Sequence, residues 1–336
     1  MKNVGIIGCG MMGKVHSIAY SSLQDVNVKA VASLSREQTL ECARLTSSKA
    51  STVEEILTDD EIEVVSICTP TDTHRDLVVE AARNRKHVFC EKPIARTLKD
   101  ALEMVEVCKQ NGVLLGVNHV VRFFDTYSRA KSLMEDGAIG TVVMARMYRG
   151  GVFPKHGWNN WFDELARSGG VLLDLSIHDF DFLRTVLGEV ESITARSVKN
   201  TPSHPGRNRD HAIAVVKFTN GSLAHVEGSW AEPENAPSKF TTSFEFVGRD
   251  GMITYDSDED FTIRVQTASK DLPSFSKSTP TANDPYGLHI QKFIEAVREE
   301  RKVPVDGIEA IEALKISLAA NRSAESGRPV KLLEVV

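Results

Sequence analysis

The stretch that decides the fold is Val4-Gly5-Ile6-Ile7-Gly8-Cys9-Gly10-Met11-Met12-Gly13. A short apolar run leads into the pattern G-x-G-x-x-G, and a helix-like stretch follows as far as Tyr20. In a dinucleotide-binding turn the first glycine permits the tight bend, the second lets the backbone approach a pyrophosphate, and the third lets helix and strand pack closely. Because the motif has the correct flanks, we favour this interpretation over a plain glycine-rich turn.

Strands and helices alternate after this turn. Apolar runs at 26–32, 63–68, 87–90 and 113–117 predict strands, and the stretches 36–45, 73–83 and 97–110 between them predict helices. Continuous apolar strands are typical of a parallel sheet that is covered on both faces. The order predicts an α/β fold with a doubly wound Rossmann sheet, in which ligands bind beyond the carboxyl ends of the strands.

The residues after the second strand bear on the choice of cofactor. An NAD-binding protein usually places an acidic residue about 20 residues beyond the glycines, for the ribose hydroxyls. Here Ser33, Ser35 and Arg36 occupy that place, and two hydroxyls with a guanidinium suit a 2′-phosphate. The hypothesis is therefore NADP(H), with NAD(H) possible. The alternative is that the two serines merely cap the next helix.

Two further strand ends carry candidate residues. Thr69 and Pro70 open a helix that reaches His74, and we expect this segment both to cap the helix and to touch the cofactor. Glu91-Lys92-Pro93 ends the strand at 87–90. Lysine is usually a surface residue, but this one stands at a strand end of a nucleotide-binding sheet, and Pro93 is a candidate for a cis peptide bond.

The pattern changes after residue 121. Long apolar-polar strands separated by tight turns, with helices before and after them, predict an α+β domain with a large open, mainly antiparallel sheet. One face of such a sheet must pack helices, and the other is available to a partner subunit. We therefore predict a Rossmann domain at 1–121 and a substrate-binding and oligomerisation domain at 122–336.

A second candidate motif lies in this later part of the chain. Gly169-Gly170 allows close backbone approach, and the segment after it is predicted to be one helix that carries Asp174 and His178. Their spacing of four residues places both on one helical face. Either residue alone would be read as a helix cap or a half-buried histidine, but together they favour a site.

Hydride transfer from a carbinol carbon to a nicotinamide needs a general base for the hydroxyl proton, and histidine suits neutral pH. A cation that stabilises the developing carbonyl oxygen assists the step. His178 fits the first role and Lys92 the second, while Asp174 could orient the imidazole or hold a neighbouring hydroxyl. This chemistry requires the two predicted domains to meet at one cleft.

These motifs together resemble the glucose-fructose oxidoreductase/inositol dehydrogenase/rhizopine catabolism (Gfo/Idh/MocA) family over essentially the whole chain. The resemblance implies bound NAD(P), sugar, inositol or related polyol substrates, a catalytic triad at Lys92, Asp174 and His178, and homodimers or homotetramers formed through the open sheet. Ser33, in place of the usual acid, resembles the NADP-preferring members. Ser168 replaces the first of three usual glycines, which is a mild change.

The expected site residues form two sets. Those expected to bind the cofactor are Gly8, Gly10, Met11, Met12, Gly13, Ser33, Ser35, Arg36, Thr69, Pro70, His74, Glu91, Lys92, Pro93, Asn118 and Trp161. Those expected to bind the substrate are Lys92, His119, Arg122, Trp158, Asp174 and His178.

Composition excludes other classes. A net charge of -6 argues against a nucleic-acid partner, and no apolar run reaches the roughly 18 residues of a membrane span. The start is too quickly broken by glycine for a signal peptide. Five scattered cysteines without metal-binding spacing predict a reduced, cytoplasmic protein with no metal site.

The leading interpretation is an NAD(P)-dependent dehydrogenase or reductase that acts on CH–OH groups of sugars or polyols. One alternative keeps the fold but is an NAD-dependent glycosidase that uses transient oxidation. A second alternative is a non-catalytic, nucleotide-sensing regulator, against which the presence of Lys92, Asp174 and His178 argues.

Overall fold

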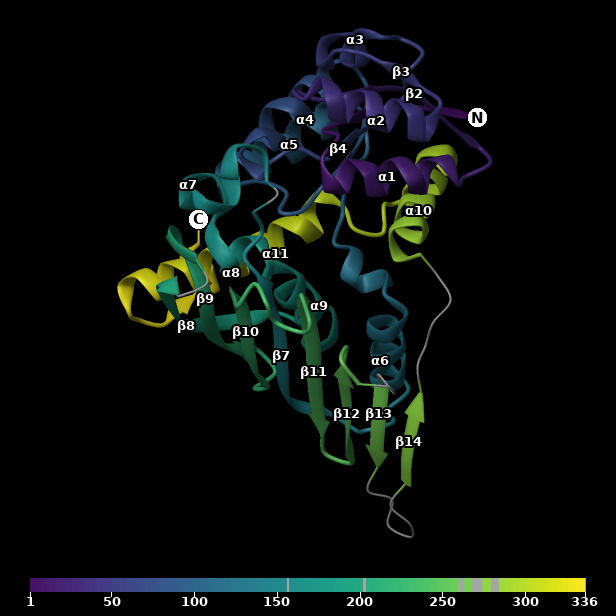
Figure 1. Ribbon diagram of the computed structural model, residues 1–336. Coiled ribbons are helices and arrows are strands. Elements are labelled where there is room, and N and C mark those ends of the chain that lie inside the picture. Colours follow the sequence, from purple (N-terminus) through teal and green to yellow (C-terminus); the bar gives the residue numbers. More distant parts are fainter. Residues whose placement is uncertain (156, 202–203, 260–262, 268–273, 279–283, 336) are drawn as a thin grey trace. The chain divides into compact units, whose positions relative to one another are not determined.

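The computed structural model describes residues 1–155, 157–201, 204–259, 263–267, 274–278 and 284–335 (Figure 1). Contacts divide the chain into two compact units. Unit 1 comprises residues 1–120, 157–161 and 284–311, and unit 2 comprises residues 121–156, 162–283 and 312–336. Two segments that the sequence-based division places in the second domain, 157–161 and 284–311, thus group with unit 1.

Unit 1 contains a parallel sheet whose described strands lie in the order β3-β2-β1-β4-β5-β6. The strands are β1 (Lys2–Ile7), β2 (Val26–Ala32), β3 (Lys49–Ala50), β4 (Val64–Ile67), β5 (His87–Cys90) and β6 (Leu115–Val117). The chain order reverses between β1 and β4, which makes their carboxyl ends the switch point where such sheets bind ligands. The predicted doubly wound sheet is confirmed.

Helices connect these strands, and one late helix joins them. They are α1 (Met11–Ser21), α2 (Arg36–Thr46), α3 (Val53–Thr58), η1 (Thr71–Thr73), α4 (His74–Arg83), α5 (Leu98–Gln110) and α10 (Pro285–Glu299). The ring of Phe293 in α10 lies 5.0 Å from that of Phe89 in β5, within a core that includes Val4 and Ile6. A segment about 200 residues downstream of the strands therefore completes their core.

Unit 2 is built on a mixed sheet with the order β14-β13-β12-β11-β7-β10-β9-β8-β15 among the described residues. The strands are β7 (Val142–Val152), β8 (Val190–Thr201), β9 (His204–Phe218), β10 (Leu223–Glu232), β11 (Phe240–Gly248), β12 (Gly251–Asp256), β13 (Ile263–Thr267), β14 (Ser274–Ser278) and β15 (Val330–Lys331). Of the pairings between described residues, only that of β7 with β10 is parallel, so the predicted open, mainly antiparallel sheet is confirmed.

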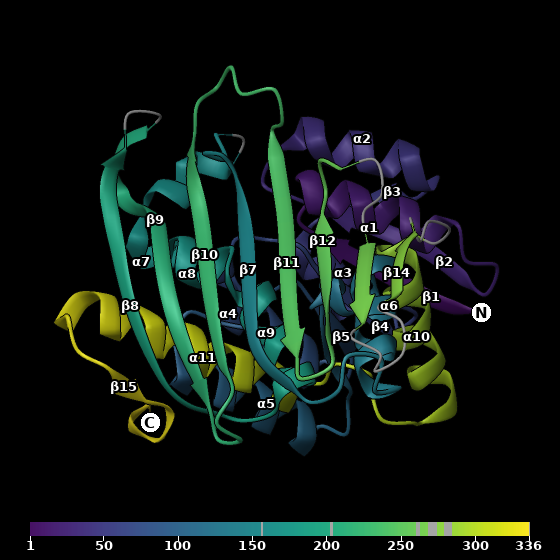
Figure 2. The same cartoon turned by 90° about the horizontal axis from the view of Figure 1, so that it is seen from below.

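Helices cover one face of this sheet, and they lie behind the strands in Figure 2. The remaining helical elements of the chain are η2 (Val120–Phe123), α6 (Asp125–Glu135), η3 (Trp158–Asp163), α7 (Leu165–Ser168), α8 (Gly170–Asp174), α9 (Ile177–Leu187), α11 (Gly307–Ser326) and η4 (Leu332–Glu334). Strand residues alternate between this covered face and the open one. In β9, Ala214 and Val216 are buried while Ile213 and Val215 are more than 40 % exposed.

Two general properties bear on the predictions from composition. All five cysteines are free thiols. Among the described residues, no helix combines the length and the apolar character needed to cross a bilayer.

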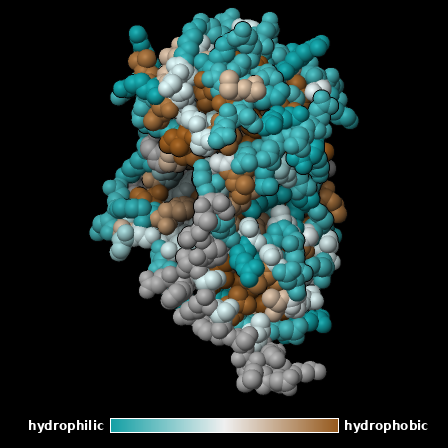
Figure 3. Space-filling view, turned by 90° about the vertical axis from the view of Figure 1, so that its right-hand side faces the viewer, coloured by the Kyte–Doolittle hydropathy of each residue, from teal (hydrophilic) through white to brown (hydrophobic). Residues whose placement is uncertain are grey.

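Hydrophilic residues predominate on the face drawn in Figure 3, with hydrophobic ones in scattered groups.

Candidate active site

The glycine-rich turn between β1 and α1 forms the first part of the candidate site. Gly8 has a φ of +97°, and its N–H donates to the Ala32 carbonyl at 2.8 Å. A Cβ on Gly13 would lie 1.9 Å from the Gly8 oxygen, so helix and turn pack this closely only with glycine there. A Cβ on Gly10 would meet nothing within 4 Å. Open space before the N-terminus of α1, where Met11 and Met12 begin the helix, fits a pyrophosphate.

The residues that follow β2 include the helix cap that the sequence analysis offered as an alternative to cofactor binding. Ser35 caps α2, because its Oγ accepts from the Gln38 N–H at 3.4 Å, and the Ser33 Oγ accepts from the Ser35 N–H at 3.4 Å. Arg36 is exposed in the first turn of α2, and no ion pair with another described residue involves it. The guanidinium is thus available to a ligand phosphate.

The segment after β4 is tied to the segment after β5 by His74. The imidazole is fully buried, with Nδ1 2.9 Å from the Pro93 carbonyl and Nε2 2.9 Å from the Thr69 carbonyl. Burial lowers the pKa of His74 in spite of these two carbonyls. Both ring nitrogens face backbone, so the contribution of His74 to a cofactor site is to hold Thr69 and Pro70 beside the Pro93 backbone.

Glu91-Lys92-Pro93 directly follows β5, and the Lys92–Pro93 peptide bond, a candidate from the sequence, is cis. Lys92 is partly buried, and its backbone N–H donates to Glu91 Oε2 at 3.1 Å. The Glu91 side chain therefore turns back to the backbone of the residue that carries the candidate catalytic ammonium group.

Glu91 is 5 % exposed and its carboxylate is closely surrounded by donors. Oε1 accepts from the Asn118 amide at 2.7 Å and from His16 Nε2 at 3.0 Å. Burial opposes ionisation, but the hydrogen bond and charge of His16, the Asn118 amide and the Lys92 charge together hold the pKa of Glu91 below its usual value. The carboxylate is thus kept in its ionised form.

The network extends through residues that the sequence analysis did not single out. His16 Nδ1 lies 2.8 Å from the Ser66 hydroxyl in β4, and the Asn118 Oδ1 accepts from His289 Nδ1 in α10 at 2.9 Å. We call His16, Ser66, Glu91, Asn118 and His289 the Glu91 network. The position of His16 one turn after Gly13 was its only sequence signal, and His289 had none. Asn118, expected to bind the cofactor, is 1 % exposed within this network.

In unit 2 the single helix predicted for Asp174 and His178 is wrong. Asp174 ends α8, whereas His178 is the second residue of α9. The helical ladder stops between them, because the Ser176 N–H bonds to the Val171 carbonyl five residues back and the His178 N–H to the Leu175 carbonyl three residues back. Asp174 and His178 therefore stand on consecutive short helices and not on one continuous helix. Asp174 is 6 % exposed and His178 is partly exposed.

The helix that carries His178 is anchored by two ion pairs. Asp179 is fully buried and pairs with Arg149 of β7, whose guanidinium also donates to the Tyr127 hydroxyl at 3.1 Å. Burial works against the charge of Arg149, but Asp179 raises the pKa of the guanidinium. Asp181 accepts from Arg122 Nε at 2.7 Å and Nη2 at 2.6 Å. Arg122, expected to bind substrate, thus uses two donors within the protein.

The remaining expected residues are Trp158, Trp161 and His119. Trp158 is 44 % exposed and begins η3, in which Asn159 has a φ of 49° and Asn160 a φ of 50°. Trp161 follows and is partly exposed. His119, which directly follows Asn118, is fully buried.

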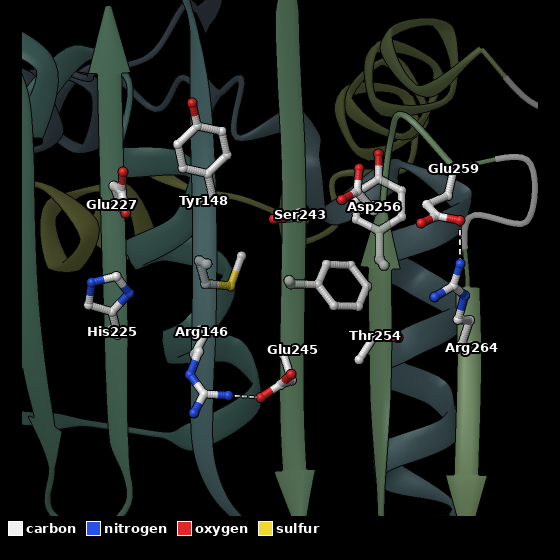
Figure 4. Close-up of a pocket in the computed structure, with 13 residues that line it drawn as sticks. Arg146, Tyr148, His225, Glu227, Ser243, Glu245, Thr254, Asp256, Glu259 and Arg264 are labelled. Carbon is white, nitrogen blue, oxygen red and sulfur yellow. Dashed lines mark hydrogen bonds and ion pairs between the residues drawn. The ribbon is translucent and has the colours of Figure 1, made fainter. Parts of the chain in front are cut away.

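Each unit therefore assembles its own group of candidate residues. In unit 1, Gly8, Thr69, Glu91 and Asn118 follow the adjacent strands β1, β4, β5 and β6. In unit 2, Asp174 and His178 stand on consecutive short elements. A hollow of about 460 Å³ on the open face of the unit 2 sheet contains none of the expected residues. It is lined by polar side chains such as Arg146, Glu245, Glu259 and Arg264 (Figure 4).

Two family models match the chain. Residues 2–119 match an oxidoreductase family with an NAD-binding Rossmann fold, and residues 127–254 match the GFO/IDH/MocA C-terminal domain.

Named relatives extend the match to nearly the full length. Inositol 2-dehydrogenase from Rhizobium meliloti is 30% identical over 339 residues, which cover 98% of this chain and 98% of the relative. 1,5-Anhydro-D-fructose reductase from Ensifer adhaerens is 28% identical over 294 residues, which cover 84% and 83%. A solved oxidoreductase from Agrobacterium radiobacter, in complex with NAD+, L-tartaric acid and magnesium, has a TM-score of 0.87 over 100% of this chain and 99% of its own. At 21% identity, this last likeness shows the fold alone.

Proposed function

The chain belongs to the Gfo/Idh/MocA family of NAD(P)-dependent oxidoreductases, and we propose that it transfers a hydride between the nicotinamide and a carbinol or carbonyl carbon of a sugar, inositol or related polyol. The observation that carries the proposal is the end of β5. There Lys92 directly follows Glu91, whose carboxylate is held ionised by the other members of the Glu91 network. Both residues follow β5, the neighbour of β4, and β4 borders the switch point of the sheet. The inositol and anhydrofructose enzymes among the relatives support the substrate class.

Three side chains have proposed chemical roles. Lys92 supplies a positive charge that stabilises the alkoxide character of the reacting oxygen. His178 takes the hydroxyl proton during oxidation and returns it during reduction. Asp174 orients the His178 imidazole or binds a neighbouring hydroxyl. The nicotinamide, when bound, supplies or accepts the hydride.

The expected cofactor and substrate contacts remain part of the proposal. The glycine turn takes the pyrophosphate, while Thr69, Pro70 and Trp161 contact the rest of the cofactor. NADP(H) is the proposed preference, because Ser33 stands where an NAD-binding protein usually has a carboxylate and the exposed Arg36 suits a 2′-phosphate. His119, Arg122 and Trp158 are the proposed contacts to further substrate hydroxyls.

A homo-oligomer formed through the open face of the unit 2 sheet is also proposed. Four apolar side chains on the open face of β8, β9 and β10 are more than 40 % exposed, namely Val198, Ile213, Val215 and Leu223. A second copy of the chain would cover them. Sedimentation should show a dimer or tetramer that Val215→Lys dissociates, while Leu333→Lys, an exposed control outside these strands, leaves it assembled. A single-chain mass for the native protein would contradict the proposal.

The experiment that tests the function is a substrate panel. Inositols, aldoses and ketoses are supplied with NADP+ or NADPH, and the nicotinamide absorbance is followed near ~340 nm. Turnover of at least one polyol or sugar, lost in His178→Asn, is expected. Retained cofactor with no net absorbance change but release of an aglycone would instead favour the glycosidase alternative. Absence of any reaction, with nucleotide bound, would favour the regulator.

A further inference from the structure

The Glu91 network includes one residue that comes from far along the chain. His289 lies in α10, within the segment 284–311 that joins unit 1 after the chain has formed most of unit 2. Its Nδ1 lies 2.9 Å from the Asn118 Oδ1, and both side chains are buried. A buried hydrogen bond of this kind determines how the two side chains are oriented, in addition to holding them in contact.

The direction of this bond sets the orientation of the Asn118 amide. Asn118 donates through Nδ2 to Glu91 Oε1 and accepts at Oδ1 from His289. If the amide were rotated by half a turn, its oxygen would face the Glu91 carboxylate and its NH2 group would face a ring N–H. The donor on His289 therefore selects the amide orientation that serves Glu91.

The carboxylate then sets the backbone of Lys92. Because His16 and Asn118 both donate to Oε1, Oε2 is left for the Lys92 N–H at 3.1 Å. Three donors from different elements fix the plane of the Glu91 carboxylate. Its Oε2 in turn fixes the backbone N–H of Lys92, the residue whose ammonium group is proposed to act on the substrate.

We infer that His289 is a positioning residue for Lys92, and that it acts through Asn118 and Glu91. The inference deepens the proposed function and rests on it for the role of Lys92. The reaction site is thus completed by α10, which joins unit 1 from late in the chain. Misplacing a catalytic group by about 1 Å costs on the order of 100-fold in rate, so a small error at Lys92 is measurable.

Alternatively, α10 could act only by packing against the strands. Phe293 in the same helix offers a variant that tests this alternative. Phe293, one turn later, packs its ring 5.0 Å from Phe89 and makes no polar contact to the network. The His289 ring packs on the same Phe89 at 5.0 Å. Phe293→Leu therefore loosens the apolar contact of α10 while it leaves every donor and acceptor of the network in place.

The experiment compares His289→Phe, His289→Asn and Phe293→Leu in the full chain. His289→Phe keeps a ring but loses the donor, whereas His289→Asn keeps a donor near the Nδ1 position. We expect His289→Phe to lower kcat by roughly 10- to 100-fold with the Kd for NADPH changed less than about threefold. His289→Asn should recover most of the native kcat. Phe293→Leu should keep kcat within about threefold of the native value, even if it lowers Tm as much as His289→Phe does.

A second measurement does not depend on activity. The Lys92 backbone amide proton, bonded to the Glu91 carboxylate, should give a downfield NMR signal that moves upfield in His289→Phe and stays in Phe293→Leu. Equal losses of kcat, or equal amide shifts, in those two variants would overturn the positioning role and leave a packing role. If the native protein turns over no panel substrate, the proposed function fails, while the amide shift still tests the link from His289 to Lys92.

Discussion

The guanidinium of Arg149 contacts the carboxylate of Asp179 through Nε at 3.2 Å and Nη2 at 2.9 Å, in the interior of unit 2. Arg149 is on β7 and Asp179 directly follows His178 on α9. Because a guanidinium stays protonated, removal of Asp179 would leave a buried charge without its counter-ion. The start of the helix that carries His178 is thus held by a buried ion pair.

Asp179→Ala is therefore expected to lower the free energy of unfolding by about 3–5 kcal/mol, measured by urea denaturation. Glu245→Ala is the control. It removes the partner of Arg146 on the open face of the same sheet, an exposed pair that contributes less than about 1 kcal/mol. Equal losses in the two variants would show that the buried pair has no special role.

The two glycines of the turn should respond differently to alanine. A Cβ at Gly13 meets the Gly8 oxygen, so Gly13→Ala should destabilise the protein itself by about 1–3 kcal/mol. Gly10 has a φ of -73° and open space around it, so Gly10→Ala should keep Tm and weaken NADPH binding, measured by fluorescence titration. An unchanged affinity of Gly10→Ala for NADPH would contradict the placement of the pyrophosphate at this turn.

Lys92→Ala should lower kcat by on the order of 100-fold or more while the Kd for NADPH changes little, because the charge acts on the transition state. Lys99→Ala, an exposed lysine in the first turn of α5, is the matched control. A variant that lost cofactor affinity but kept kcat would remove Lys92 from the catalytic group.

Cofactor preference should follow the residues after β2. Ser33→Asp combined with Arg36→Ala should raise the KM for NADP+ and lower that for NAD+, because a carboxylate repels a 2′-phosphate and accepts from ribose hydroxyls. Arg44→Ala, an exposed arginine at the other end of α2, should change neither. Comparable kcat/KM for both nucleotides in the native protein would contradict the NADP preference.

His74 should make stability depend on pH. Because burial lowers its pKa in the folded state, the unfolded chain binds the proton more readily. The stability that neutral His74 contributes is complete above about pH 6.5 and declines as the pH falls toward the folded pKa. His74→Gln should flatten Tm against pH between about 7.5 and 5. Thr73→Val, which removes hydrogen bonds to Thr69 and Pro70 but no titrating group, should lower Tm equally at each pH.

The sequence predicted those parts of the candidate site whose conformation depends on neighbouring residues. The glycine turn, the strand end at Glu91-Lys92-Pro93 and the cis bond depend on neighbouring residues. The break between Asp174 and His178 lies at the backbone bonds from Ser176 to Val171 and from His178 to Leu175, which the spacing of apolar residues does not predict. The bond from Asn118 to His289 joins residues 171 positions apart, and its energy arises only when distant elements meet.

The place of β7 in its sheet has a consequence for the order in which the protein is made. β7 lies between β10 and β11, which follow one another in the chain but do not pair (Figure 2). A ribosome completes β7 at residue 152, whereas its two neighbours begin at residues 223 and 240. The central strand therefore emerges with both of its edges unpaired. An unpaired strand edge is a template for pairing with another chain, so β7 carries this liability until β10 and β11 have been made.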